Sequence, residues 1–174
     1  MASLEVLLSE QQIQDKVSEL ARRISADYGD TPVLLVAVLK GSFLFLADLV
    51  RQLGANVEVD FVQTSSYGEG TSSTGVVQIR KDLDISIEGR DVLIVEDILD
   101  TGLTLAHLRE LLGTRRPRSL KVVTLLRKPG AAQHGTQAEY VGFEIPDRFV
   151  VGYGLDHAER YRNLPYVAVL HEAV

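Results

Sequence analysis

The sequence predicts an α/β domain that is built on a mostly parallel central β-sheet flanked by helices. The uninterrupted apolar run at residues 33–39 and the largely apolar segments at 91–95 and 120–126 are typical of strands that are buried on both faces of a parallel sheet. Segments with the apolar spacing of helices alternate with these runs through the first two thirds of the chain. This alternation favours βαβ units with right-handed crossovers.

The composition is that of a globular protein with one sizeable core. The chain has 174 residues, of which 45% are hydrophobic and 24% are charged. The net charge of −6 argues against nucleic acid as a partner, and the absence of cysteine excludes disulfides and thiolate chemistry. No apolar run has the length of a membrane span and no signal peptide is evident, so we expect a cytoplasmic protein with no membrane partner.

The first elements follow from capping and periodicity. Ser9 and Gln12 form a plausible capping box for a helix that continues to about Tyr28. After the strand at residues 33–39, residues 43–53 have the pattern of a second helix, which Gly54 ends. The alternating residues 57–62 then predict a strand that is covered on one face.

The middle of the chain combines a polar loop with the next strand–helix unit. Residues 65–75 are rich in Gly, Ser and Thr, which predicts a mobile loop, and residues 76–80 read as the returning arm of a hairpin. The strand at residues 91–95 precedes a helix at residues 103–113 that a glycine ends. Later elements are the strand at 120–126, a turn at 128–130 and short strands at 140–145, 149–153 and 166–170.

The most informative segment joins the strand at residues 91–95 to the helix that follows. Glu96, Asp97 and Asp100 lie at the carboxyl end of the strand, and the turn Thr101–Thr104 opens the helix. Ligands bind at this edge of open α/β sheets, and the N–H groups of a helix N-terminus attract phosphate. The acids can hold sugar hydroxyls, a divalent cation or a proton in transit. A plain capped turn is the alternative, but three clustered acids repel one another unless something compensates them.

This segment, residues 95–104, resembles the signature of the type I phosphoribosyltransferases, which bind 5-phosphoribosyl-1-pyrophosphate. Residues 38–41, 66–67, 125–128 and 142–153 are similar to the group of that family that acts on hypoxanthine and guanine. The resemblance implies the type I fold in one domain, residues 1–174. It also implies a small hood over the purine site, formed by the N-terminal segment and roughly residues 141–174.

The resemblance also implies a reaction. The 5-phosphoribosyl group of 5-phosphoribosyl-1-pyrophosphate would pass to N9 of hypoxanthine or guanine, giving IMP or GMP plus pyrophosphate in purine salvage, with Mg²⁺ as cofactor. A xanthine-preferring enzyme and a non-catalytic regulator that senses nucleotides remain alternatives. The family forms homodimers and homotetramers, and we expect one of these states.

The family assigns the acidic segment to the ribose and its phosphate. Glu96 and Asp97 would hold the ribose hydroxyls, and Asp100 would act as the general base near purine N7. The 5′-phosphate would bind to Asp100, Thr101, Gly102, Leu103 and Thr104. Magnesium would lie near Glu96, Asp97 and Asp156. Leu103 occupies a slot that varies in the family and puts little in doubt.

Pyrophosphate would bind at the turn after the first central strand and at two distant segments. The residues are Lys40, Gly41, Ser66, Tyr67 and Arg162. The family has a non-proline cis peptide at this turn, here Leu39–Lys40, and its loop closes as a lid over the site. Without the resemblance, Lys40 reads equally well as an exposed turn lysine and the loop as one without a catalytic role. Ser42 and Ser65 depart from some relatives, and neither removes a proposed role.

The purine would be recognised by Lys128, Phe149, Val150 and Asp156. A lysine ammonium is a pure hydrogen-bond donor, so it suits the 6-oxo group of hypoxanthine and disfavours adenine. Phe149 would stack on the base, and the backbone of Val150 would meet its edge. Residue statistics alone favour a solvated strand-end lysine at Lys128 and allow a core aromatic at Phe149.

Overall fold

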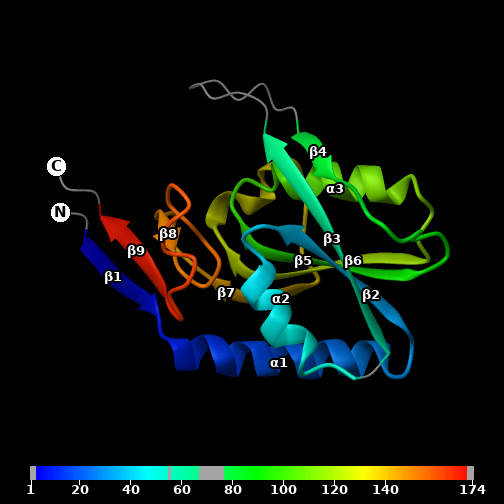
Figure 1. Cartoon of the computed structure of the whole chain (residues 1–174), viewed down its shortest axis with the longest axis horizontal. Coiled ribbons are helices and arrows are strands. Elements are labelled where there is room, and N and C mark those ends of the chain that lie inside the picture. The colour runs from blue at the N-terminus through cyan, green and yellow to red at the C-terminus, as the bar shows by residue number, and fades with distance from the viewer. Residues whose placement is uncertain (1–2, 55, 67–76, 172–174) are drawn as a thin grey trace.

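Two β-sheets and three α-helices make up the computed structural model, which describes residues 3–54, 56–66 and 77–171. Figure 1 shows α1 and α2 on one side of the larger sheet and α3 on the other, with the smaller sheet at one end. In chain order the elements are β1 (Ser3–Leu8), α1 (Glu10–Tyr28), β2 (Val33–Leu39), α2 (Phe43–Val50), β3 (Val57–Ser66), β4 (Val77–Lys81), β5 (Asp91–Leu99), α3 (Leu103–Gly113), β6 (Ser119–Arg127), the 3₁₀ helix η1 (Pro129–His134), β7 (Tyr140–Glu144), β8 (Val150–Val151) and β9 (Val167–His171).

The larger sheet has the strand order β4-β3-β2-β5-β6-β7. All neighbouring pairs in it are parallel except β3 and β4, which form an antiparallel ribbon. The predicted mostly parallel sheet flanked by helices is therefore confirmed. Its central strands β2, β5 and β6 end side by side, so the segments that follow them meet at one edge.

Alternation along the strands divides the core into two layers. Leu35 and Leu93 pack with the helices α1 and α2, whereas Leu34 and Ile94 pack with α3. Because successive side chains of a strand point to opposite faces, an uninterrupted apolar run fills both layers at once. This burial accounts for the apolar runs from which the strands were predicted.

The helix boundaries agree with the predicted capping and differ at one end. Ser9 Oγ accepts a hydrogen bond of 3.1 Å from the Gln12 backbone N–H, and the Gln12 side chain accepts one of 2.8 Å from the Ser9 backbone N–H. The capping box is therefore confirmed. The second helix ends at Val50, not at residue 53 as predicted. The N–H of Gln52 bonds to the carbonyl three residues back, which is turn geometry and not α-helical geometry.

The smaller sheet pairs the two ends of the chain in the antiparallel order β1-β9-β8. Strand β1 has no counterpart among the strands predicted from the sequence. Strand β8 covers only Val150–Val151, shorter than the predicted 149–153, because the backbone then turns through positive φ values at Gly152, Tyr153 and Gly154. Residues 129–134 form a 3₁₀ helix, longer than the turn predicted at residues 128–130.

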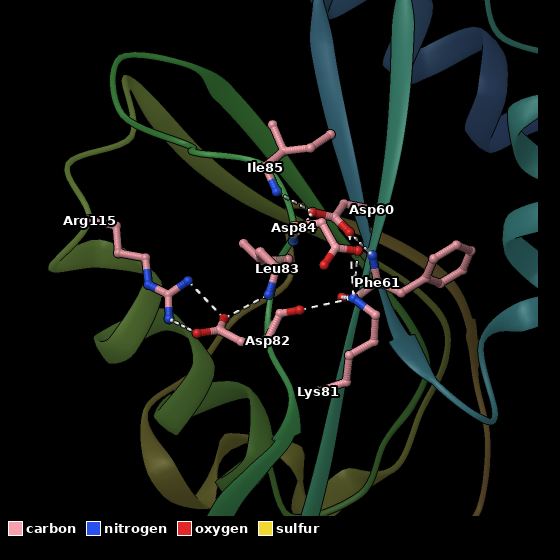
Figure 2. A network of polar contacts seen from close by, with 8 residues as sticks. All are labelled: Asp60, Phe61, Lys81, Asp82, Leu83, Asp84, Ile85 and Arg115. Atoms are coloured by element: carbon pink, nitrogen blue, oxygen red, sulfur yellow. Dashed lines mark hydrogen bonds and ion pairs between the residues drawn. The ribbon is translucent and has the colours of Figure 1, made fainter.

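A buried carboxylate fixes the base of the β3–β4 ribbon. Asp60, 4% exposed, accepts hydrogen bonds from the backbone N–H groups of Phe61, Asp84 and Ile85 at 2.7–3.0 Å. Figure 2 shows how Lys81 and the pair between Arg115 and Asp82 continue this network toward α3. Asp60 therefore ties the segment that follows β4 to the middle of β3.

The described helices include none with both the length and the apolarity needed to cross a membrane.

Candidate active site

The loops after β2, β5 and β6 enclose a cavity of about 280 Å³ together with the segment that follows β8. Nine of the sequence-predicted site residues line it: Lys40, Gly41, Asp97, Asp100, Lys128, Phe149, Val150, Asp156 and Arg162. A small apolar cavity also lies at the opposite ends of β2 and β3, where no predicted residue is found. The predicted residues therefore converge, although they come from segments more than 100 positions apart.

A second hollow of about 100 Å³ lies at the start of α3. Its lining includes Glu96 and the complete turn from Asp100 to Thr104. Gly102 gives α3 no side-chain cap, and Thr101 Oγ1 accepts only a long hydrogen bond of 3.4 Å from the Leu103 N–H, so the N–H groups at the start of this helix can still bind an anion. Gly102 has a φ of 80°, and a Cβ there would lie 2.4 Å from the Ala131 carbonyl oxygen, so only glycine fits this turn.

Asp100 and Ile98 border both hollows, so the two are joined at Asp100. The neighbouring acids Glu96 and Asp97 separate onto opposite sides of this junction because they follow one another along β5. Glu96 faces the hollow at the start of α3, whereas Asp97 faces the larger cavity. Glu96 and Asp97, which were predicted to act as one pair, thus line different hollows.

Both of these acids are held in an unfavourable environment for negative charge. Burial raises the pKa of Glu96 well above its usual value, and the charge of Asp97 raises it further. Burial also raises the pKa of Asp97 to about 6, although the Ile98 N–H and the positive charge of Arg162 oppose this rise. Hydroxyl donors or a cation would therefore relieve an existing electrostatic cost at this position.

The turn after β2 is packed tightly between Asp97 and the Gly152–Gly154 segment. The peptide bond Leu39–Lys40 is cis, as the family resemblance implied. A Cβ on Gly41 would lie 1.8 Å from Asp97 Oδ2, and one on Gly154 would lie 2.1 Å from the Gly41 carbonyl oxygen. Glycine at both positions allows the backbone to line the cavity wall directly.

Arg162 reaches the same wall from the far end of the chain. Its guanidinium donates to the Gly154 carbonyl at 2.8 Å and lies 3.1 Å from Asp156 Oδ1. Its Nε is buried and has no hydrogen-bond partner among the residues that the structure describes. The guanidinium also lines the cavity, so it can pair with an anion that enters there.

Two residues without a predicted role stabilise the side of the cavity that the turn after β2 and the Gly152–Gly154 segment form. The hydroxyl of Tyr153 donates to Asp48 on α2, and burial followed by this hydrogen bond raises the pKa of the phenol far above its usual range. Glu159 bridges Lys40 and Arg162. No periodicity or motif spacing marks either residue, because both act through contacts between segments that lie far apart in the sequence.

The opposite end of the larger cavity combines a buried cation with an exposed ring. Lys128 is 8% exposed, and its Nζ lies 3.3 Å from Asp100 Oδ2 and 3.6 Å from Asp147 Oδ1. Phe149 is 53% exposed and meets His157 edge-on at 5.6 Å between ring centroids. The statistical alternatives for both positions are therefore wrong: Lys128 is not solvated and Phe149 is not a core residue.

Two predicted positions, Ser66 and Tyr67, are not among the described residues that line either hollow. Ser66 ends β3 and pairs with Val77, but nothing of its side chain is described. Tyr67 and most of the loop predicted at residues 65–75 lie outside the described residues.

A metal ion fits this site only as part of a complex with a ligand. Among the described residues, no three potential metal ligands converge on one point. Asp97 and Asp156 both line the larger cavity, and the charge of Asp156 contributes to the raised pKa of Asp97. One or two carboxylates, with the remaining positions taken by phosphate oxygens and water, are what Mg²⁺ usually uses in phosphate sites. The donor set therefore fits magnesium bound together with a phosphate compound.

Comparison with known proteins gives a consistent result over nearly the whole chain. The family profile described as a phosphoribosyl transferase domain matches residues 3–158. A hypoxanthine-guanine phosphoribosyltransferase of Bacillus subtilis is 55% identical over 169 residues, which cover 97% of this chain and 94% of that protein.

Solved structures agree with this match. A crystal structure of a hypoxanthine-guanine phosphoribosyltransferase from Bacillus anthracis superimposes with a TM-score of 0.91 at 46% identity, covering 99% of this chain and all of that chain. A hypoxanthine phosphoribosyltransferase from Staphylococcus aureus gives the same TM-score at 51% identity, covering 96% of this chain and 91% of that one.

Proposed function

The chain belongs to the phosphoribosyl transferase family and has the type I fold, and on this premise we propose that it is a purine salvage enzyme. It transfers the 5-phosphoribosyl group of 5-phosphoribosyl-1-pyrophosphate to N9 of hypoxanthine or guanine. The products are IMP or GMP and pyrophosphate. The observation that carries this proposal is the junction of the two hollows at Asp100, which offers an anion site on one side and a cationic wall on the other.

The donor spans this junction. Its 5′-phosphate binds to the amides and hydroxyls of Thr101 to Thr104, while Lys40, Gly41 and Arg162 bind the diphosphate. The ribose lies between them, with its hydroxyls held by Glu96 and Asp97. Holding both ends of the donor fixes C1 relative to the base and lowers the entropic cost of the transfer.

The charge of the site supports a transition state in which the C1–oxygen bond to pyrophosphate breaks ahead of bond formation. Positive charge then develops on the ribosyl group, and the carboxylates of Glu96 and Asp97 stabilise it. Magnesium, held by Asp97 and Asp156 with Glu96 close by, would neutralise charge on the departing pyrophosphate. The guanidinium of Arg162 binds the same leaving group.

The purine completes the arrangement. Lys128 donates a hydrogen bond to the 6-oxo group, Phe149 stacks on the ring, and Val150 and Asp156 border its edge. Asp100 takes the proton from N7 as the base attacks C1. This carboxylate is a weak base, but the purine proton becomes more acidic as N9 bonds to the ribosyl cation.

Further features of the enzyme follow from the same proposal. Residues 1–174 act as one domain, with the sheet β1-β9-β8 as the hood beside the purine. Ser66 and Tyr67 contribute to the pyrophosphate site from the loop that follows β3. The active form is a homodimer or homotetramer, which sedimentation at several concentrations would test, and the cytoplasmic location stays a prediction.

A steady-state comparison of hypoxanthine, guanine, xanthine and adenine tests the function. We expect turnover of hypoxanthine and guanine that requires Mg²⁺, and very low turnover of adenine. Xanthine as the best substrate would favour the xanthine-preferring alternative. Binding of 5-phosphoribosyl-1-pyrophosphate without turnover of any base would favour the regulator.

A further inference from the structure

One acidic side chain lies where an anionic ligand would be expected. The Glu159 carboxylate is 3.1 Å from Lys40 Nζ and 3.3 Å from the guanidinium of Arg162. Both cations line the larger cavity, although they are separated by more than 100 residues in the sequence. Glu159 thus joins two segments of the cavity wall by charged hydrogen bonds.

The backbone presents Glu159 in a fixed way, but nothing buries its side chain. Ala158 and Glu159 have φ values of 50° and 63°, and the Glu159 N–H donates to Asp156 Oδ2 at 2.9 Å. The side chain itself is 65% exposed. It can therefore rotate into solvent without disturbing the turn that carries it.

The contacts of Glu159 are those that a diphosphate needs. The hydrogen bond from Lys40, with that from Arg162, lowers the pKa of the Glu159 carboxyl, so the group is charged near neutral pH. A diphosphate draws on the same ammonium and guanidinium donors, and it is also repelled by a nearby carboxylate. Glu159 and the diphosphate therefore compete for one pair of cations.

We propose that Glu159 is a built-in competitor that sets the affinity of the site for the diphosphate group. This inference rests on the proposed function, because it concerns the leaving group of that reaction. The carboxylate replaces the departing pyrophosphate on Lys40 and Arg162, which prevents this product from being held too tightly. Release of product limits turnover in many enzymes, so such a competitor would favour turnover at the expense of donor affinity.

The test uses the full-length variant Glu159→Gln, which removes the charge and keeps the shape. Binding of inorganic pyrophosphate in the presence of Mg²⁺ is measured by titration calorimetry, together with KM for both substrates. We expect pyrophosphate to bind about three- to tenfold more tightly, the size expected for two partly exposed ion pairs. KM for the donor should fall, and KM for hypoxanthine should stay unchanged.

Two further variants make the result specific. Glu88→Gln is the matched control, because the Glu88 side chain is 60% exposed, pairs with Arg116 at 2.7 Å and does not line the cavity. Glu159→Asn also removes the charge, and asparagine tolerates the left-handed backbone, so it should reproduce the tighter binding. Equal or weaker pyrophosphate binding by both Glu159 variants would overturn the inference. A wild-type protein that neither binds pyrophosphate nor turns over a 6-oxopurine would overturn the proposed function itself.

Discussion

Replacing Asp97 with asparagine should stabilise the protein without ligand while abolishing most of its activity. In the folded chain the pKa of Asp97 is about 6, compared with 3.8 for an ordinary aspartate, and burial is the largest cause. At 1.36 kcal/mol for each pH unit, this difference corresponds to about 3 kcal/mol. The figure is an upper estimate, because the carboxylate borders an open cavity.

The sign follows from proton binding. A carboxyl whose pKa rises on folding holds its proton more tightly in the folded state. Its ionisation therefore lowers the stability of the fold once the pH exceeds the pKa of the same group in the unfolded chain. The loss of stability grows between pH 3.8 and about pH 6 and reaches its full size above that range. Asp97→Asn removes this cost and also lowers the repulsion on Glu96.

Chemical denaturation between about pH 3 and about pH 8 measures the effect. The variant should gain up to about 3 kcal/mol at the alkaline end and much less than 1 kcal/mol below pH 4. The control is Asp30→Asn, at an exposed aspartate, which should leave the free energy of unfolding unchanged at both ends of the pH range. A variant no more stable than the wild type at high pH, or a gain that does not depend on pH, would refute the reasoning.

Three further substitutions test the remaining roles. Asp100→Ala should lower kcat by about 10²- to 10⁴-fold with little change in the affinity for the donor, because a general base acts in the transition state. A rise in KM at unchanged kcat would contradict that role. Lys128→Ala should lower kcat/KM for hypoxanthine by about 10- to 100-fold and narrow the discrimination against adenine, whereas a uniform loss for all bases would argue against base recognition. Tyr153→Phe removes the hydrogen bond to Asp48 and should reduce the free energy of unfolding, measured by denaturant titration, by about 1–2 kcal/mol. An unchanged midpoint of the unfolding transition would show that this hydrogen bond does not stabilise the fold.

The elements that the sequence predicted well are those in which burial dictates the residue pattern. The run at residues 33–39 coincides with β2 because both faces of that strand are covered by helices. The α1 cap is likewise local, since Ser9 and Gln12 satisfy one another within three residues. Strand β1 escaped prediction because most of it is exposed and its pairing partner lies at the other end of the chain.

The residues of the candidate site also differ in how far the sequence alone could predict them. Asp100 and Thr101–Thr104 lie in one continuous motif, so their residue types and spacing predicted an anion site where the structure has a hollow. Lys128 and Phe149 became informative only through family resemblance, because the burial of one and the exposure of the other depend on the surrounding fold. Glu159 and Tyr153 could not be found from the sequence, because their partners Lys40 and Asp48 lie more than 100 residues away.

The pairing of the first strand with the last has a consequence for synthesis on the ribosome. Among the described residues, β1 is an edge strand that pairs with β9 alone, and Ser3 lies opposite His171 (Figure 1). During translation β1 therefore stays without this partner until β9 has left the ribosome. Strands β2, β5 and β6 lie between the two in the sequence and can associate earlier, so the nascent chain can form this edge of the larger sheet before the smaller sheet closes.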